Sequence, residues 1–166
     1  MVDTEVQRAT VEMAWRVLSE ISDPEIPVLS LVDLQIIRAV NVEGPTVSVD
    51  MTPTFLGCPA LEYMKNEIRE KLLSAGFERV DVVLKLSPAW SSDLLSEEAR
   101  EKLRVFGVAP PEKRAATLAE TLKKPVACPY CKSYDTRLES SFGPTLCKQI
   151  FYCDSCKQSF ERFKTL

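Results

Sequence analysis

The feature that most constrains the chain is a pair of Cys-x-x-Cys motifs, Cys128–Cys131 and Cys153–Cys156, separated by 21 residues. Each motif places two thiolates at the tip of a tight turn, and two such turns supply the tetrahedral set of four sulfurs that zinc prefers. The intervening length suits two short strands, predicted over 136–140 and 149–152, with a third over 160–163. A segment of about 40 residues buries too little apolar surface to fold unaided, so we expect one bound Zn²⁺ per chain to stabilise it.

The identity of the metal stays open at this point. The chain has no histidine, so a soft-metal site must be built from cysteine, with Asp or Glu as the other strong candidates. Four sulfurs also suit iron or an iron–sulfur cluster. The segment Cys128-Pro-Tyr-Cys131 matches the glutaredoxin tetrapeptide as well, but a redox dithiol needs a long helix after the motif, and a turn-like Lys-Ser-Tyr-Asp follows it here. Disulfides are disfavoured in a reducing compartment.

Cys147 adds a fifth thiol to this region, six residues before Cys153. One interpretation is a buried free thiol that packs in the small domain. The other is an additional or replacement metal ligand, as an iron–sulfur site would allow. The sequence leaves both interpretations open.

The rest of the chain predicts an α+β fold, a small α/β sandwich with the element order α-β-β-α-β-α. Helices are expected over 5–21, 59–75 and 97–106, and strands over 34–40, 46–51 and 80–86. Ser96 is a candidate N-cap for the last helix, and Gly107 a candidate C-terminal stop. We therefore predict an α/β domain over 1–108, a linker over 109–124 that begins near Pro110-Pro111, and a zinc-ribbon-like domain with four cysteine ligands over 125–166.

A second candidate site lies in the first domain. Cys58 directly precedes a predicted helix, where the helix dipole and free backbone N–H groups favour a thiolate with a lowered pKa. It is either a reactive thiol or transient metal ligand, or a small residue that packs a tight turn. Asp23, Glu25 and Asp33 flank a proline-rich loop. They are either solvated turn residues or acids that help to hold a metal beside Cys58.

Composition narrows the classes of function. The net charge of −3 disfavours a general nucleic-acid binder, which would carry a basic excess. No apolar stretch reaches the roughly 18 residues of a membrane span, and Met1-Val-Asp-Thr-Glu5 lacks the features of a secretory signal. We therefore expect a cytoplasmic protein with no nucleic-acid or membrane partner. The oligomeric state is left open.

Several motifs carry a family resemblance. Asp23-Pro-Glu-Ile-Pro-Val28, Asp33-Leu34 and the run 52–59, Thr-Pro-Thr-Phe-Leu-Gly-Cys-Pro, resemble the iron–sulfur assembly domain of SufT-like proteins and cytosolic iron–sulfur targeting factors. Ser87-Pro-Ala-Trp90, the Cys-x-x-Cys pairs and the run 142–148, Phe-Gly-Pro-Thr-Leu-Cys-Lys, are similar to the PaaD (PaaJ) family. Only the linker lies outside the resemblance.

The resemblance implies a maturation role rather than catalysis. PaaD-like proteins are thought to help insert or repair the iron–sulfur cluster in the reductase component of phenylacetyl-CoA monooxygenase, during aerobic phenylacetate breakdown. The resemblance places Cys58 at the position of the family's reactive cysteine and Asp23, Glu25 and Asp33 in the family's acidic loop. It also places Cys147 in a family motif. Gln35 stands where the broader family commonly has glycine, and we interpret it as an ordinary strand residue.

Two other functions remain open on the residues. A rubredoxin-like electron carrier would hold iron in the four-cysteine site and cycle one electron. A zinc-ribbon interaction module would use the same site as a structural centre. Metal content and colour on reduction distinguish the first of these from the others, because zinc has no redox chemistry.

Overall fold

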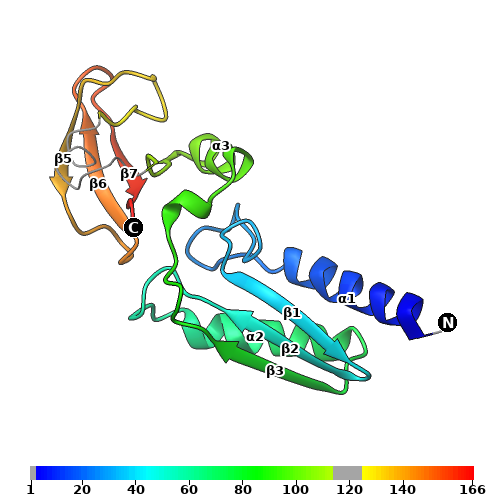
Figure 1. Ribbon diagram of the computed structural model, residues 1–166. Coiled ribbons are helices and arrows are strands. Elements are labelled where there is room, and N and C mark those ends of the chain that lie inside the picture. The colour runs from blue at the N-terminus through cyan, green and yellow to red at the C-terminus, as the bar shows by residue number, and fades with distance from the viewer. Residues whose placement is uncertain (1–2, 114–124) are drawn as a thin grey trace. The chain divides into compact units, whose positions relative to one another are not determined.

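The structure is a computed structural model that describes the backbone of residues 3–113 and 125–166. The chain forms two compact units, Met1–Trp90 and Ser91–Leu166. Figure 1 shows the elements of each unit. None of the helices in these ranges is both long and apolar enough to cross a lipid bilayer.

The first unit is a three-stranded sheet with two helices. Its elements are α1 (Asp3–Ser19), β1 (Ile37–Glu43), β2 (Thr46–Met51), α2 (Leu61–Ser74) and β3 (Arg79–Leu84). The strand order is β1-β2-β3, in which β1 is antiparallel to β2 and β3 is parallel to it. Helix α1 contacts β1, α2 contacts β3, and the two helices contact each other (Figure 1).

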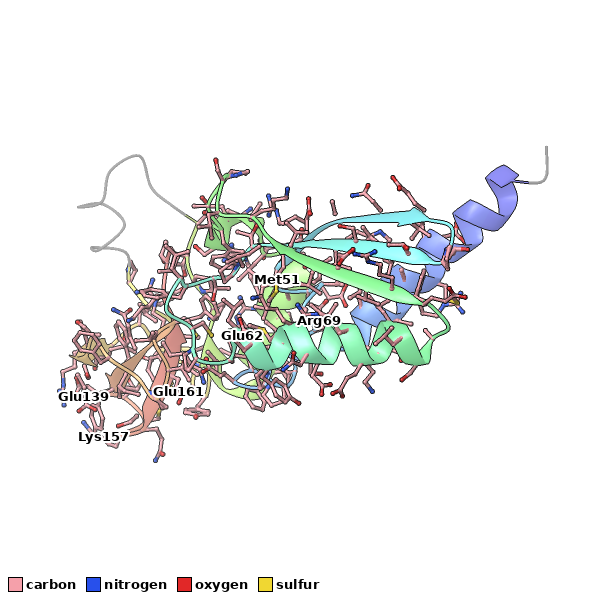
Figure 2. All side chains as sticks on the ribbon, turned by 90° about the horizontal axis from the view of Figure 1, so that it is seen from below. Met51, Glu62, Arg69, Glu139, Lys157 and Glu161 are labelled. Atoms are coloured by element: carbon pink, nitrogen blue, oxygen red, sulfur yellow. The ribbon has the colours of Figure 1, made fainter. Side chains whose placement is uncertain are left out.

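Alternation and helical spacing explain the core of this unit. On β2, Val47, Val49 and Met51 are fully buried, while the residues between them are partly exposed. This period of two places one strand face against the helices. Met51 lies between the sheet and α2 (Figure 2), and α2 buries three residues at helical spacing. Those three residues are Met64, Ile68 and Leu72.

The second unit contains a four-stranded sheet. Its elements are η1 (Ser92–Leu94), α3 (Glu97–Phe106), β4 (Val108–Ala109), β5 (Thr136–Ser140), β6 (Lys148–Cys153) and β7 (Ser159–Phe163). The order is β4-β7-β6-β5, with β4 parallel to β7 and the other pairs antiparallel. The rings of Phe151 and Phe160 stack with centroids 5.8 Å apart inside the small core.

The ends of α3 agree with the prediction. The Ser96 side chain accepts a hydrogen bond from the backbone N–H of Ala99, and Gly107 adopts a left-handed conformation with φ 91°. A Cβ at Gly107 would also lie 3.3 Å from the ring of Tyr130. Glycine is therefore favoured at this position by both backbone conformation and space.

Buried polar contacts tie α3 to the segment on either side of it. Arg100 is buried, and its guanidinium donates to the backbone carbonyls of Leu95, Ser92 and Pro111. The Ser92 backbone N–H donates to the carbonyl of Leu166, and the Leu166 N–H donates to Ser92 Oγ. These bonds join η1, α3 and the end of the ribbon in one folded unit.

The α+β fold and the element order agree with the prediction, but several details differ. The compact units divide after Trp90, whereas the sequence predicted a boundary at residue 108, because β4 pairs with β7 and groups α3 with the ribbon. Ala109, expected in the linker, lies in β4, and residues 114–124 of that linker lie outside the described residues. The first strand begins at Ile37 rather than residue 34, because residues 30–36 form a hydrogen-bonded turn.

Candidate metal centre

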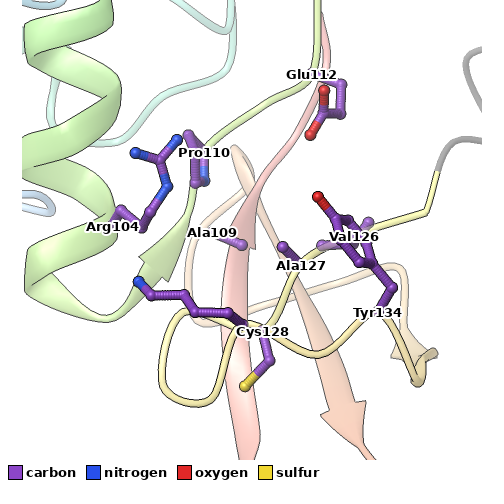
Figure 3. A pocket seen from close by; sticks show the side chains of 9 residues that line it. Arg104, Ala109, Pro110, Glu112, Val126, Ala127, Cys128 and Tyr134 are labelled. Carbon is purple, nitrogen blue, oxygen red and sulfur yellow. The ribbon is translucent and has the colours of Figure 1, made fainter.

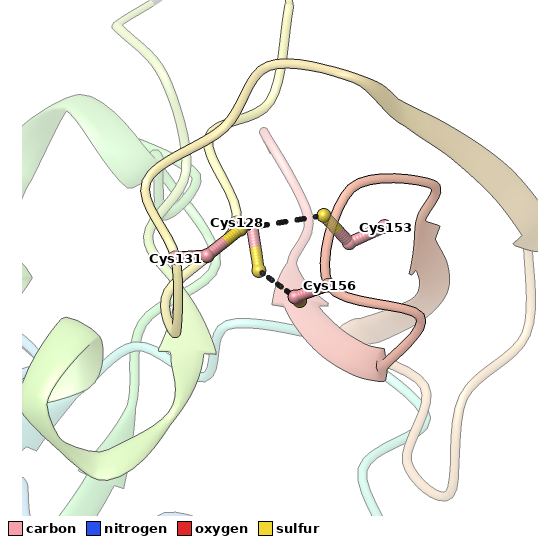
Figure 4. A group of neighbouring side chains, drawn as sticks. All are labelled: Cys128, Cys131, Cys153 and Cys156. Carbon is pink, nitrogen blue, oxygen red and sulfur yellow. Dashed lines mark hydrogen bonds between the residues drawn. The ribbon is translucent and has the colours of Figure 1, made fainter.

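The four cysteines of the two motifs converge in the second unit. Their sulfur atoms all lie within 4.8 Å of one another. Cys128 Sγ is 3.7 Å from Cys156 Sγ, and Cys131 Sγ is 3.5 Å from Cys153 Sγ (Figure 4). A tetrahedral site with Zn–S bonds of about 2.3 Å places its sulfurs about 3.8 Å apart. The donor set and spacing therefore fit one Zn²⁺ or one iron ion.

The two turns that carry these cysteines have the same backbone structure. We call them the first knuckle (residues 128–133) and the second knuckle (residues 153–158). In each knuckle, the backbone carbonyl of the first cysteine accepts a hydrogen bond from the N–H of the lysine that follows the second cysteine. The N–H of the first cysteine donates to the carbonyl of the residue after that lysine, which is Ser133 in the first knuckle and Gln158 in the second. Lys132 and Lys157 have φ values of 65° and 59°. This left-handed step turns the backbone back over the cysteines, so each pair of sulfurs faces the same point.

The sequence did not reveal this left-handed step. Neither position is glycine, the usual residue for positive φ. The one indication in the sequence was that a lysine follows the second cysteine in both motifs. Two turns that share the Cys-x-x-Cys-Lys pattern indicate similar backbone paths, even without glycine.

Polar contacts link the segments that carry the two knuckles. Ser133 Oγ and Ser155 Oγ are 2.7 Å apart, one from each knuckle. The Asp154 N–H donates to the carbonyl of Asp135 at 2.8 Å, and the Asp154 carboxylate pairs with Arg137 at 3.2 Å. These contacts help to position the two knuckles, and a bound ion would supply the larger part of the stability.

The cysteine environments differ in burial and in acidity. Cys128 and Cys153 are buried, Cys156 is partly exposed and Cys131 is exposed. The pKa of Cys153 is lowered to about 7, mainly because the backbone N–H of Cys156 donates to its sulfur. Burial raises the pKa of Cys156 to about 12. An incoming ion must therefore displace the proton of Cys156 in order to bind its sulfur.

Cys147 lies outside the group of four. Among the described residues, the sulfurs that cluster are those of the two knuckles. Cys147 is buried, and its Sγ lies 3.2 Å from Thr145 Oγ1. Its backbone carbonyl accepts from the N–H of Lys164. The position fits the interpretation of a packed thiol, and a ligand role for Cys147 stays a prediction.

A cavity of about 350 Å³ borders the first knuckle (Figure 3). Apolar residues of β4 and of the segment before the knuckle form part of its wall, and Arg104, Lys132, Glu112 and Tyr134 contribute polar atoms. Cys128 also reaches this wall. One side of the first knuckle therefore borders open space rather than packed side chains.

The second candidate site, at Cys58, lies in the first unit. Cys58 follows β2 and precedes α2, and its thiol is partly buried. Its pKa is raised, chiefly by burial, whereas N–H groups of Ala60 and Leu61 act in the opposite direction. The nearby charges of Glu25 and Asp23 also raise it. The predicted lowering of this pKa is wrong, because desolvation and two acids outweigh the helix terminus.

The acids of the loop have distinct structural roles. Asp23 Oδ1 accepts from the backbone N–H groups of Glu25 and Ile26 at 2.8 and 2.9 Å, which fixes the turn. Asp33 Oδ2 accepts from the N–H of Ser30, whose hydroxyl accepts from the N–H of Asp33. Asp23 and Glu25 act electrostatically on Cys58. Metal binding by these acids stays a prediction.

The interpretation of Gln35 as an ordinary strand residue is wrong. Its φ is 55°, a left-handed conformation that glycine adopts without strain. The neighbouring Leu34 carbonyl accepts a hydrogen bond of 2.7 Å from the buried Trp90 indole. The loop therefore keeps the backbone shape that a glycine would favour, although the residue is glutamine.

Comparisons with known proteins agree with both halves of this description. The model of the iron–sulfur cluster assembly protein family matches residues 12–84, and that of the PaaD zinc beta ribbon domain matches residues 112–164. A protein from Escherichia coli (strain K12), provisionally named as one of the subunits of 1,2-phenylacetyl-CoA epoxidase, is 44% identical over 156 residues, which cover 94% of this chain and 93% of that protein. The chain belongs to the PaaD family. The predicted resemblance is confirmed.

Two further proteins are similar to part of this PaaD family member. A protein of Porphyromonas gingivalis (strain ATCC BAA-308 / W83), named Fe-S protein maturation auxiliary factor, is 38% identical over 96 residues, covering 57% of this chain and 90% of that protein. The crystal structure of a domain of unknown function, DUF59, from Bacillus anthracis superposes with a TM-score of 0.57 at 22% identity. It covers 61% of this chain and 97% of that one, and it supports the fold alone.

Proposed function

We propose that this protein is a non-catalytic accessory factor that assists iron–sulfur cluster assembly or insertion in the reductase component of phenylacetyl-CoA monooxygenase. One observation carries the proposal: a single chain joins an assembly-type domain, with Cys58 beside Asp23 and Glu25, to a four-cysteine ribbon of the PaaD type. The names of its relatives, an epoxidase subunit and a maturation factor, support the same role.

The environment of Cys58 suits a transient ligand. Because its pKa is raised, the thiol is protonated at neutral pH. Iron or a cluster, the cargo, must displace that proton to bind, which weakens the bond relative to one with a ready thiolate. A weak donor can pass its cargo to a tighter acceptor with several cysteines. The nearby carboxylates would offset the positive charge of iron while it is held.

The ribbon takes a different role in this proposal. Four cysteine sulfurs within 4.8 Å of one another suit a tightly held ion, and we propose one Zn²⁺ per chain with a structural function. The rubredoxin-like alternative requires iron at this site and a colour change on reduction. Metal content and the absorption spectrum of protein purified anaerobically without a metal-chelating tag distinguish the two.

The proposal is tested in cells that lack the native copy of the gene. They are supplied with the wild type or Cys58→Ala, and the reductase component is then purified. We expect reductase from Cys58→Ala cells to contain much less iron and sulfide per chain than the wild type, while the zinc content of the variant itself is unchanged. Fully loaded reductase in these cells would remove Cys58 from the mechanism.

A further inference from the structure

We propose that the loop of residues 140–148 is a docking site for a partner protein, which receives the Phe142 ring in an apolar pocket rimmed by carboxylates. The inference rests on the proposed function for the identity of the partner, the reductase component. It concerns a part of the ribbon that the metal centre does not use. Exposure, rigidity and charge each support it.

The loop presents apolar side chains to solvent. Phe142 is 75% exposed and Leu146 is 41% exposed. A phenylalanine that served only the ribbon core would be buried, as Phe151, Phe160 and Phe163 are. Aromatic residues that insert into a partner's pocket contribute most of the energy at many protein interfaces.

The loop is held in one conformation by its own bonds. Ser140 Oγ donates to the carbonyl of Phe142 at 2.8 Å and accepts from its N–H at 3.1 Å. The Gly143 N–H donates to the carbonyl of Lys148 at 2.9 Å, and the Lys148 N–H donates to that of Thr145.

Glycine is favoured at position 143 by a close approach of the backbone. A Cβ there would lie 3.0 Å from the backbone of Lys148, so any larger residue would push the two sides of the loop apart. The exposed ring therefore projects from an ordered loop, and little conformational entropy is lost when it binds.

The charges around the loop indicate what surrounds the partner's pocket. The segment 140–148 contains no acidic residue, although the whole chain has a net charge of −3. Lys164 Nζ lies 5.4 Å from the centroid of the Phe142 ring and donates to the carbonyl of Leu146. In the described ranges Lys164 forms no ion pair, whereas Lys148 pairs with Glu161. One uncompensated cation beside an exposed ring matches an apolar pocket with carboxylates at its rim.

The test measures binding of the full-length, metal-loaded protein to the purified reductase component by isothermal titration calorimetry. We expect Phe142→Ala to raise the Kd roughly 30-fold, as loss of a hot-spot aromatic does. Lys164→Gln should raise the Kd less and reduce its dependence on salt, because one charge contact is lost. Tyr134→Ala is the matched control, since Tyr134 is an exposed aromatic (64%) of the same unit outside the loop, and it should leave the Kd within about twofold.

The outcomes separate this inference from the proposed function. Equal affinity of the wild type and Phe142→Ala, or no binding by the wild type, would overturn the docking site. Unchanged zinc content and circular dichroism of Phe142→Ala exclude unfolding as the cause of a loss. The proposed function is judged by the iron content of the reductase in cells with Cys58→Ala, a measurement that does not depend on Phe142.

Discussion

Gln35 provides a sharp test of the loop geometry, because glycine and valine at this position should have different effects on stability. The residue lies near the end of the turn of residues 30–36 with a φ of 55°, and its N–H donates to the carbonyl of Val32. Gln35→Gly supplies the residue that this conformation favours. Gln35→Val supplies the residue that a strand favours. An ordinary strand position would be stabilised by valine, and a left-handed one would be destabilised by it.

The magnitudes follow from the backbone conformation. A left-handed conformation costs an L-residue about 1–2 kcal/mol, which glycine avoids. Glycine also makes the unfolded chain more flexible, which offsets about 0.5–1 kcal/mol of that stabilisation. The exposed hydrogen bond from Gln35 Nε2 to the carbonyl of Val32 is also lost. We expect Gln35→Gly to leave stability unchanged or raise it by up to about 1 kcal/mol. Gln35→Val should lower it by about 1–3 kcal/mol.

Urea denaturation followed by tryptophan fluorescence reports on the right part of the molecule. Both tryptophans, Trp15 and Trp90, belong to the first unit, so the metal centre does not contribute to the signal. The free energy of unfolding is compared at equal m-value. A Gln35→Val variant as stable as the wild type would refute the left-handed assignment.

Three further results are expected. Removal of the metal by a chelator under reducing conditions should unfold the second unit, since a structural metal contributes on the order of 10 kcal/mol. Dispersed NMR amide signals of β5, β6 and β7 that survive metal loss would contradict this. Alkylation of Cys58 by iodoacetamide, followed by mass spectrometry, should be slow at pH 7 and rise with pH, because its raised pKa keeps the thiol protonated. Glu25→Gln removes a charge that raises this pKa and should speed the reaction, and an unchanged rate would exclude that influence. Gly107→Ala should lower the free energy of unfolding of the second unit by about 1–2 kcal/mol, because φ is left-handed and the new Cβ approaches the Tyr130 ring. Gly76→Ala tests backbone strain alone, because φ is also left-handed there but a Cβ would meet nothing within 4 Å.

The sequence predicted the features that depend on local pattern. The Cys-x-x-Cys spacing indicated the four-sulfur cluster, and Ser96 and Gly107 marked both ends of α3. It did not predict β4, because two residues carry no periodic signal and their pairing with β7 is decided by packing. The raised pKa of Cys58 was missed for a similar reason. Burial and approach of the acidic loop are tertiary effects, whereas the helix terminus is a local influence that can be read from the chain.

The short strand β4 has a consequence for how this architecture can be divided. The family model of the ribbon begins at residue 112, yet the edge of its sheet is supplied by residues 108 and 109, and Arg100 bonds the helix before them to Pro111. The piece that recurs in other sequences is therefore shorter than the piece that folds here. A ribbon excised at residue 112 would expose one backbone edge of β7 to solvent and to other chains. A cut after Trp90 would keep that edge covered.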